Sequence, residues 1–175
     1  TIDGNLIAAE GIGDGDLILD NVTVTGALVV RGGGEHSIII RGNSSVSTIT
    51  AQGRDGGVRL SVEDDASVEI ITIDDGSDAV IVAGTVGTLN VAGTEAQVTV
   101  AGTVDTLTVS EQAEGASITV SGGATVNNLT AAAPNTAVTV GKGGTVESVT
   151  ADGAGTPVSG AGKGENVTAN ARNGA

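Results

Sequence analysis

Short segments in which apolar and polar residues alternate recur along most of the chain at a nearly constant interval. The segment "VAGTVGTLNV" (82–91) returns as "VAGTVDTLTV" (100–109). Comparable copies begin at residues 38, 60, 80, 98, 118, 138 and 158, so the intervals are 22, 20, 18, 20, 20 and 20 residues. Each copy holds two or three alternating segments, and turns rich in Gly, Asp, Ser and Thr separate them. Alternation with a period of two predicts β-strands.

A repeat of about 20 residues indicates a solenoid, a propeller or another array. No copy contains an uninterrupted amphipathic helix, which excludes leucine-rich repeats, and a propeller blade is about twice as long. We therefore predict an all-β, single-domain parallel β-helix of about eight coils. Irregular turns favour a right-handed helix over the strictly periodic left-handed form. The predicted domain spans residues 1–175, with an irregular N-terminal cap (1–35), regular coils (36–156) and a degenerate C-terminal coil or cap (157–175).

Stacked coils bury apolar side chains that a single coil would leave exposed, because each apolar position meets its equivalent in the next coil. Two inward-facing ladders follow from the repeat. The first ladder contains Val46, Val68, Val86, Val104, Val126 and Val146. The second contains Ile49, Ile71, Leu89, Leu107, Leu129 and Val149.

Composition restricts what this core and its surface can contain. The chain has no Phe, Trp, Tyr, Met or Cys, so the core consists of Val, Ile, Leu and Ala, and disulfides are excluded. The formal net charge is −14, with 21 acidic and 7 basic residues. We expect no nucleic-acid partner, because phosphate binding needs clustered Lys and Arg. We also expect no membrane insertion, because no apolar run approaches the ~20 residues of a spanning helix.

Outward-facing positions form columns rich in threonine and serine. Threonine is common in strands, and stacked hydroxyl pairs stabilise a sheet by about 0.2–1 kcal/mol each. One interpretation of the columns is therefore purely structural. The alternative is ice binding, because regular Thr-x-Thr arrays on flat β-helix faces resemble those of some antifreeze proteins. The array is interrupted at Ile70, Asn90, Asn128 and Ser148.

Acidic residues concentrate in predicted turns, most densely in "IDDGSD" (73–78). Carboxylate and carbonyl oxygens are the ligands that Ca²⁺ takes in proteins. Asp74, Asp75 and Asp78 are therefore the candidate calcium ligands, and calcium is the only cofactor that the sequence suggests. The segment matches no EF-hand loop and does not recur in each coil, so solvated turn carboxylates are the alternative.

Catalytic chemistry has little support, and we predict no catalytic residues and no enzyme. His36, the single histidine, follows Glu35 in the Gly-rich turn "RGGGEHS" (31–37). Many polysaccharide lyases and hydrolases are right-handed β-helices, but their sugar-binding grooves use aromatic platforms, which this chain lacks. A patch of arginines near carboxylates keeps carbohydrate binding or polysaccharide cleavage open as an alternative. Its members are Arg31, Arg41, Arg54 and Arg59 with Asp55, Asp64 and Asp65.

The stretch "NVTVTGALVVRGGGEHSIIIRGNSSVSTIT" (21–50) resembles a β-helical module of secreted proteins from Gram-positive bacteria. Its strand "VTVTGALVV", the turn "RGGGEHSI" and the following "SSVSTIT" carry the resemblance. Such proteins often contain surface-layer homology domains elsewhere. The resemblance implies a cell-surface spacer or scaffold and transfers no catalytic residue.

Together these observations predict a non-catalytic structural or scaffold module of an extracellular or cell-surface protein. Cell-wall or extracellular polysaccharide is the expected partner class. Self-association, either end-to-end or lateral, is the other expected interaction, because an uncapped solenoid exposes strand edges.

Overall fold

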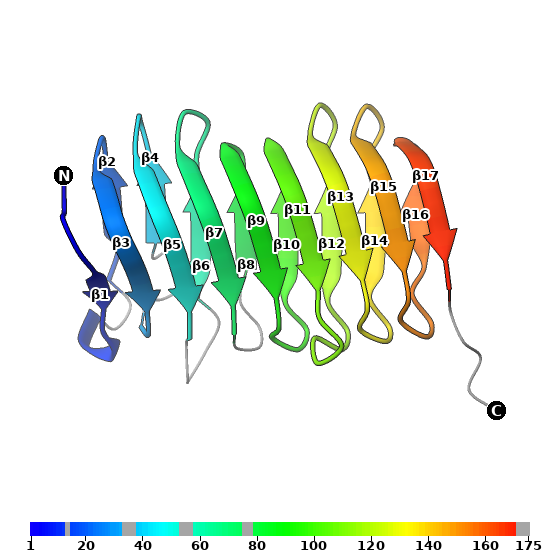
Figure 1. Cartoon of the computed structure of the whole chain (residues 1–175), viewed down its shortest axis with the longest axis horizontal. Coiled ribbons are helices and arrows are strands. Elements are labelled where there is room, and N and C mark those ends of the chain that lie inside the picture. Colours follow the sequence, from blue (N-terminus) through cyan, green and yellow to red (C-terminus); the bar gives the residue numbers. More distant parts are fainter. Residues whose placement is uncertain (13–14, 33–37, 53–57, 75–78, 171–175) are drawn as a thin grey trace.

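The chain forms two parallel β-sheets that face each other along one long axis (Figure 1). The structure is a computed structural model that describes residues 1–12, 15–32, 38–52, 58–74 and 79–170. Within these residues, strands account for all the regular structure except one 3-10 turn, Glu10–Ile12. The predicted fold class is confirmed, with about seven turns of about 20 residues in place of the about eight expected.

The longer strands build one sheet and the shorter strands the other. The nine-stranded sheet contains β1 (Leu6–Ala8), β3 (Thr23–Val30), β5 (Ser45–Ala51), β7 (Ser67–Ile73), β9 (Thr85–Val91), β11 (Thr103–Val109), β13 (Thr125–Ala131), β15 (Thr145–Ala151) and β17 (Lys163–Ala169). The eight-stranded sheet contains β2 (Leu17–Asp20), β4 (Ile38–Arg41), β6 (Arg59–Val62), β8 (Ala79–Val82), β10 (Gln97–Val100), β12 (Ser117–Val120), β14 (Ala137–Val140) and β16 (Val158–Gly160).

The solenoid winds in the right-handed sense, as predicted. In Figure 1 the nine-stranded sheet lies nearer the viewer and its strands run downwards. The strands of the other sheet run upwards behind it while the chain advances from left to right. Each strand therefore pairs in parallel with its equivalent one coil away, as β11 does with β9 and β13.

The inward ladders form as the repeat predicted. Val104 pairs with Val86 on one side and with Val126 on the other, and all three side chains are fully buried. Leu107 lies in the same way between Leu89 and Leu129. The core is consequently a continuous column of Val, Ile, Leu and Ala that runs through successive coils.

The long strands differ from the expectation of separate short segments, because the second and third segments of each copy join into one strand. In β11 both Val104 and Leu107 are buried, although three positions separate them. The pairing joins Val104 to Val86 and Thr106 to Thr88 and passes over Asp105. Gly87 is passed over on β9 in the same way, so both strands bend at this place and neither has an extra residue. The bend recurs in neighbouring coils, so it preserves the stacking instead of interrupting it.

The corners between the sheets leave no space for some side chains. A Cβ atom at Gly102 would lie 2.1 Å from the carbonyl oxygen of Ala83 and 2.2 Å from that of Gly84. Because both oxygens belong to the backbone of the neighbouring coil, neither can rotate away. We expect Gly102→Ala to lower the free energy of unfolding by about 1–3 kcal/mol, the cost of forced overpacking. Chemical denaturation monitored by circular dichroism measures this loss.

Gly11→Ala is the matched control for this substitution. A Cβ atom at Gly11 would meet no atom within 4 Å. Its free energy of unfolding should stay within about 0.5 kcal/mol of the wild-type value. Equal effects of the two substitutions would contradict the close approach at Gly102.

Candidate functional site

The most regular surface of the molecule is a strip of two outward columns on the nine-stranded sheet. Uncharged side chains occupy every position of the strip from β5 to β17, and all of them except Ile70 bear a hydroxyl or an amide. The first column contains Thr48, Ile70, Thr88, Thr106, Asn128, Ser148 and Asn166. The second contains Thr50, Thr72, Asn90, Thr108, Thr130, Thr150 and Thr168.

Backbone pairing sets the spacing of this strip. Neighbouring coils repeat every ~4.8 Å, and two residues along a strand advance ~6.6 Å. Because successive side chains of a strand point to opposite faces, both columns lie on the same outer surface. The side chains are half-buried or exposed, so solvent reaches the array. The result is a regular array of hydroxyl and amide groups, interrupted at Ile70 and without charge, on a chain whose net charge is −14.

Carboxylates flank this strip at the positions that the strand pairing passes over, and two of them, Glu69 and Asp105, accept a hydrogen bond from an adjacent coil. Asn127 donates from Nδ2 to Oδ1 of Asp105 at 2.6 Å. Ser47 donates from Oγ to Oε2 of Glu69 at 3.2 Å. These bonds link successive coils outside the backbone ladder, and a sequence read in isolation does not show them.

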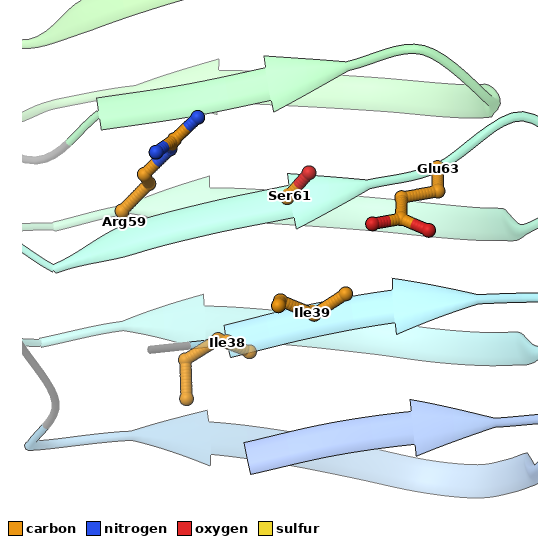
Figure 2. Close-up of a pocket in the computed structure, with 5 residues that line it drawn as sticks. All are labelled: Ile38, Ile39, Arg59, Ser61 and Glu63. Atoms are coloured by element: carbon orange, nitrogen blue, oxygen red, sulfur yellow. The ribbon is translucent and has the colours of Figure 1, made fainter. Parts of the chain in front are cut away.

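A shallow hollow of about 140 Å³ lies on the outer face of the eight-stranded sheet (Figure 2). Ser61 pairs with Ile39 on β4 and with Ile81 on β8, so a small side chain stands between two large ones in this column. Figure 2 shows Arg59 and Glu63 toward opposite ends of the same stretch of chain, with Ser61 between them. The hollow combines a guanidinium, a hydroxyl, a carboxylate and an apolar wall, which suits a small polar molecule.

In the arginine and carboxylate patch considered from the sequence, Arg41 is paired with a carboxylate that the patch did not include, Asp20. Arg41 pairs with Asp20 through Nη2, 2.9 Å from Oδ2, and its Nε donates to the same oxygen at 3.0 Å. Both side chains are 45% exposed, so the pair stabilises the fold by at most about 1 kcal/mol. Asp64 and Asp65 lie exposed in the turn after β6. Residues 54 and 55 lie outside the described residues.

A second surface feature, an open notch of about 270 Å³, lies at the corner that follows the long strands. Glu95, Glu114 and Asn135 are among the residues that line it. Asn135 donates from Nδ2 to Oε1 of Glu114 at 3.1 Å. The backbone at this corner is left-handed in successive coils, with φ of 56° at Glu95 and Asn135, 74° at Gly115 and 68° at Gly155.

The left-handed backbone at this corner predicts that Glu95 destabilises the fold. Glycine adopts this backbone conformation freely, whereas a residue with a Cβ atom is strained in it by about 1–2 kcal/mol. Glu95→Gly should therefore raise the free energy of unfolding by about 0.5–1 kcal/mol after the entropy of glycine is subtracted. Thermal or chemical denaturation measures the change.

Glu111→Gly is the control, since Glu111 is an exposed turn residue in the ordinary negative-φ region. This substitution removes the same charge without relieving backbone strain. The free energy of unfolding of the variant should therefore be unchanged or slightly lower. A stability loss in Glu95→Gly as large as that in Glu111→Gly would contradict the strain at residue 95.

The calcium prediction remains a prediction. Asp74 is exposed, and its Oδ2 accepts a hydrogen bond from Gln52 Nε2 at 3.3 Å. Asp75 and Asp78, the other two candidate ligands, lie outside the described residues, as do Glu35 and His36. In the part of the chain that the structure describes, no three His, Cys, Asp or Glu side chains gather as metal ligands do.

The fold places the chain in the class of parallel β-solenoid proteins. No known protein family, characterised protein or solved structure matches the chain. Nor does any helix in the described ranges have the length and apolar character needed to cross a membrane.

Proposed function

We propose that the chain is a rigid, non-catalytic structural module of an extracellular or cell-surface protein. The observation that carries the proposal is the continuous register of both sheets, which joins every coil to the next by backbone pairing. A single aliphatic column fills the space between the sheets. Local opening of such a structure breaks pairing and core contacts in two neighbouring coils together.

One feature of the chain supports a location outside the cell. The stretch 21–50 resembles β-helical modules of secreted Gram-positive proteins, where such modules act as surface spacers. The net charge of −14 favours solubility and disfavours adhesion between copies. Cell-wall or extracellular polysaccharide is the partner class that we propose for the exposed faces.

Small-angle scattering and limited proteolysis test the structural role. We expect a rod about 35–40 Å long, since about eight strand spacings of ~4.8 Å separate the first and last strands of the larger sheet. A protease of broad specificity should leave the regular coils from β8 to β15 intact. Cleavage within these strands under native conditions would contradict a rigid module.

An activity assay distinguishes the scaffold from a polysaccharide-cleaving enzyme. Acidic and neutral polysaccharides are incubated with the chain and assayed for new reducing ends and for unsaturated products. The scaffold proposal expects neither product. If the wild-type chain forms products and an Arg59→Ala, Glu63→Ala double variant does not, the scaffold proposal is wrong and the hollow in Figure 2 is a catalytic site.

Ice binding is the second candidate, and the register of the uncharged strip is the observation that favours it. Threonine hydroxyls both donate and accept hydrogen bonds, as water does. No charged side chain interrupts the strip from β5 to β17.

Thermal hysteresis measures this activity directly. A Thr106→Lys variant places a charge within the strip and should abolish hysteresis, whereas Ser117→Lys on the other sheet should not. Both residues are outward-facing, so both variants should fold. Absence of hysteresis in the wild-type chain at high concentration would end this proposal.

A further inference from the structure

The hollow on the outer face of the eight-stranded sheet lies where one outward column changes from large to small. Ser61 pairs with Ile39 on one side and with Ile81 on the other, and all three side chains are half-buried. The serine lacks the carbon atoms that its two neighbours extend outwards, so a gap remains between them. Its volume of about 140 Å³ exceeds the ~30 Å³ that one water molecule occupies in the liquid. The hollow therefore has room for a small organic molecule.

The same coil departs from its neighbours in charge as well. Arg59 and Glu63 occupy the outward positions on either side of Ser61, so the three side chains lie on one face of the sheet (Figure 2). The equivalent positions of the next four coils contain no charged residue. They are Ala79 and Ala83, Gln97 and Ala101, Ser117 and Ser121, and Ala137 and Gly141. The gap in the column and the two opposite charges therefore coincide in one coil.

Both charged side chains have bonding capacity for a ligand. Arg59 is half-buried, and its guanidinium has five N–H donors, more than a single partner uses. Glu63 is exposed, and its carboxylate forms no hydrogen bond or ion pair within the described ranges. Arg41, in the adjacent coil, pairs instead with Asp20 at 2.9 Å. The hollow therefore has a donor group at one end and an unused acceptor group at the other.

The two charges select the class of ligand. A simple anion is repelled by Glu63 and by the net charge of −14, whereas Arg59 disfavours a simple cation inside the hollow. A zwitterion has no net charge, so the field of the whole chain does not repel it. Its carboxylate and its ammonium group also match the two ends of the hollow.

The spacing of the two charged residues sets the size of that zwitterion. Arg59 and Glu63 are four residues apart in extended chain, which separates their Cα atoms by ~13 Å, and they form no ion pair with each other. A free amino acid holds both of its charges on one carbon atom. A dipeptide places them on two Cα atoms ~3.8 Å apart and adds a peptide group between them. The Ser61 hydroxyl can donate to or accept from that group.

We propose that the hollow binds a zwitterionic peptide of dipeptide size, with its carboxylate at Arg59, its ammonium group at Glu63 and its peptide group at Ser61. Hydrogen bonds to both charged residues are charge-assisted, and Ile39 provides an apolar wall for a small side chain of the ligand. No covalent bond forms or breaks, so this is a binding site that adds to the proposed structural role and does not depend on it.

NMR titration of the isotope-labelled 175-residue chain with alanylalanine tests the proposal. We expect saturable shifts of the amide signals of Ile39, Ser61 and Glu63, and none in β15. N-acetyl-alanylalanine lacks the ammonium group, and alanylalaninamide lacks the carboxylate. Each should bind about tenfold or more weakly than alanylalanine, because each has lost one charge-assisted interaction.

A substitution that fills the hollow tests its place on the sheet. Ser61→Ile introduces the residue that both adjacent coils already have in this column, so the variant should fold and should lose binding. Thr99→Ile is the matched control, because it adds the same side chain to the same column of β10, beyond Ile81. The control should bind alanylalanine as the wild-type chain does, and circular dichroism verifies that both variants fold.

The orientation of the ligand follows from combining variants with modified ligands. Glu63→Gln should weaken the binding of alanylalanine about tenfold or more but leave that of N-acetyl-alanylalanine unchanged, because the interaction that it removes is already absent. Arg59→Gln should have the corresponding effects on alanylalanine and alanylalaninamide.

Three results would overturn the proposal. The first is the absence of saturable shifts at the hollow in the wild-type chain. The second is N-acetyl-alanylalanine that binds as tightly as alanylalanine, which means that Glu63 does not recognise the ammonium group. The third is a folded Ser61→Ile variant with wild-type affinity, which places the ligand elsewhere on the surface.

Discussion

A Val104→Asp variant is expected to be strongly destabilised. Val104 is fully buried and lies between Val86 and Val126 in the inner ladder, with aliphatic side chains above and below it. A carboxylate at this position finds no partner and no water, so burying it costs several kcal/mol. We expect the free energy of unfolding to fall by about 4 kcal/mol or more, a large part of the about 5–15 kcal/mol that stabilises a typical domain.

Circular dichroism and chemical denaturation test this expectation. Thr103→Asp is the matched control, because Thr103 is exposed and points away from the core one position earlier. It should change stability by no more than about 0.5 kcal/mol. A Val104→Asp variant as stable as Thr103→Asp would mean that residue 104 is not inside the solenoid, and the stacking would be wrong.

Leu107→Ala is expected to cost about 2–5 kcal/mol, because it leaves a cavity in the centre of the column. Leu107 is fully buried between Leu89 and Leu129. The backbone on both sides is held by parallel pairing along six residues of each neighbouring strand. The coils therefore have little freedom to collapse into the space, which favours the upper part of the range.

Val167→Ala in the same column is the control for this substitution. Val167 is 54% exposed, so truncating it removes little buried area and leaves no enclosed cavity. We expect a loss of less than about 1 kcal/mol for it by denaturation at low protein concentration. A Leu107→Ala loss as small as the Val167→Ala loss would show that the middle of the column is not closely packed.

The repeat predicted the ladders because stacking is a local rule applied many times. Once coil length is known, the residue that lies above Val86 must be Val104, and the pairing of β9 with β11 bears this out. The outer columns followed from the same rule, since a strand exposes alternate side chains. The aliphatic core followed from the absence of every aromatic residue and methionine.

Other features could be identified only from the distances between atoms of neighbouring coils. The sequence divided each copy into two or three segments, but pairing with both neighbours holds Val104 and Leu107 in one bent strand. The need for glycine at residue 102 depends on carbonyl oxygens some 18 residues earlier in the chain. The small Ser61 between Ile39 and Ile81 likewise forms a hollow only when three coils are superimposed.

The sequence by itself determined the architecture of this protein, and the tertiary structure decided its local chemistry. A periodic pattern specifies which side chains meet, because hydrophobic burial and backbone pairing act identically in every coil. Close backbone approaches and side-chain hydrogen bonds such as that of Asn127 with Asp105 vary from coil to coil. These features depend on the distance in space between atoms that lie about 20 residues apart in the chain, and a periodic sequence pattern does not specify that distance.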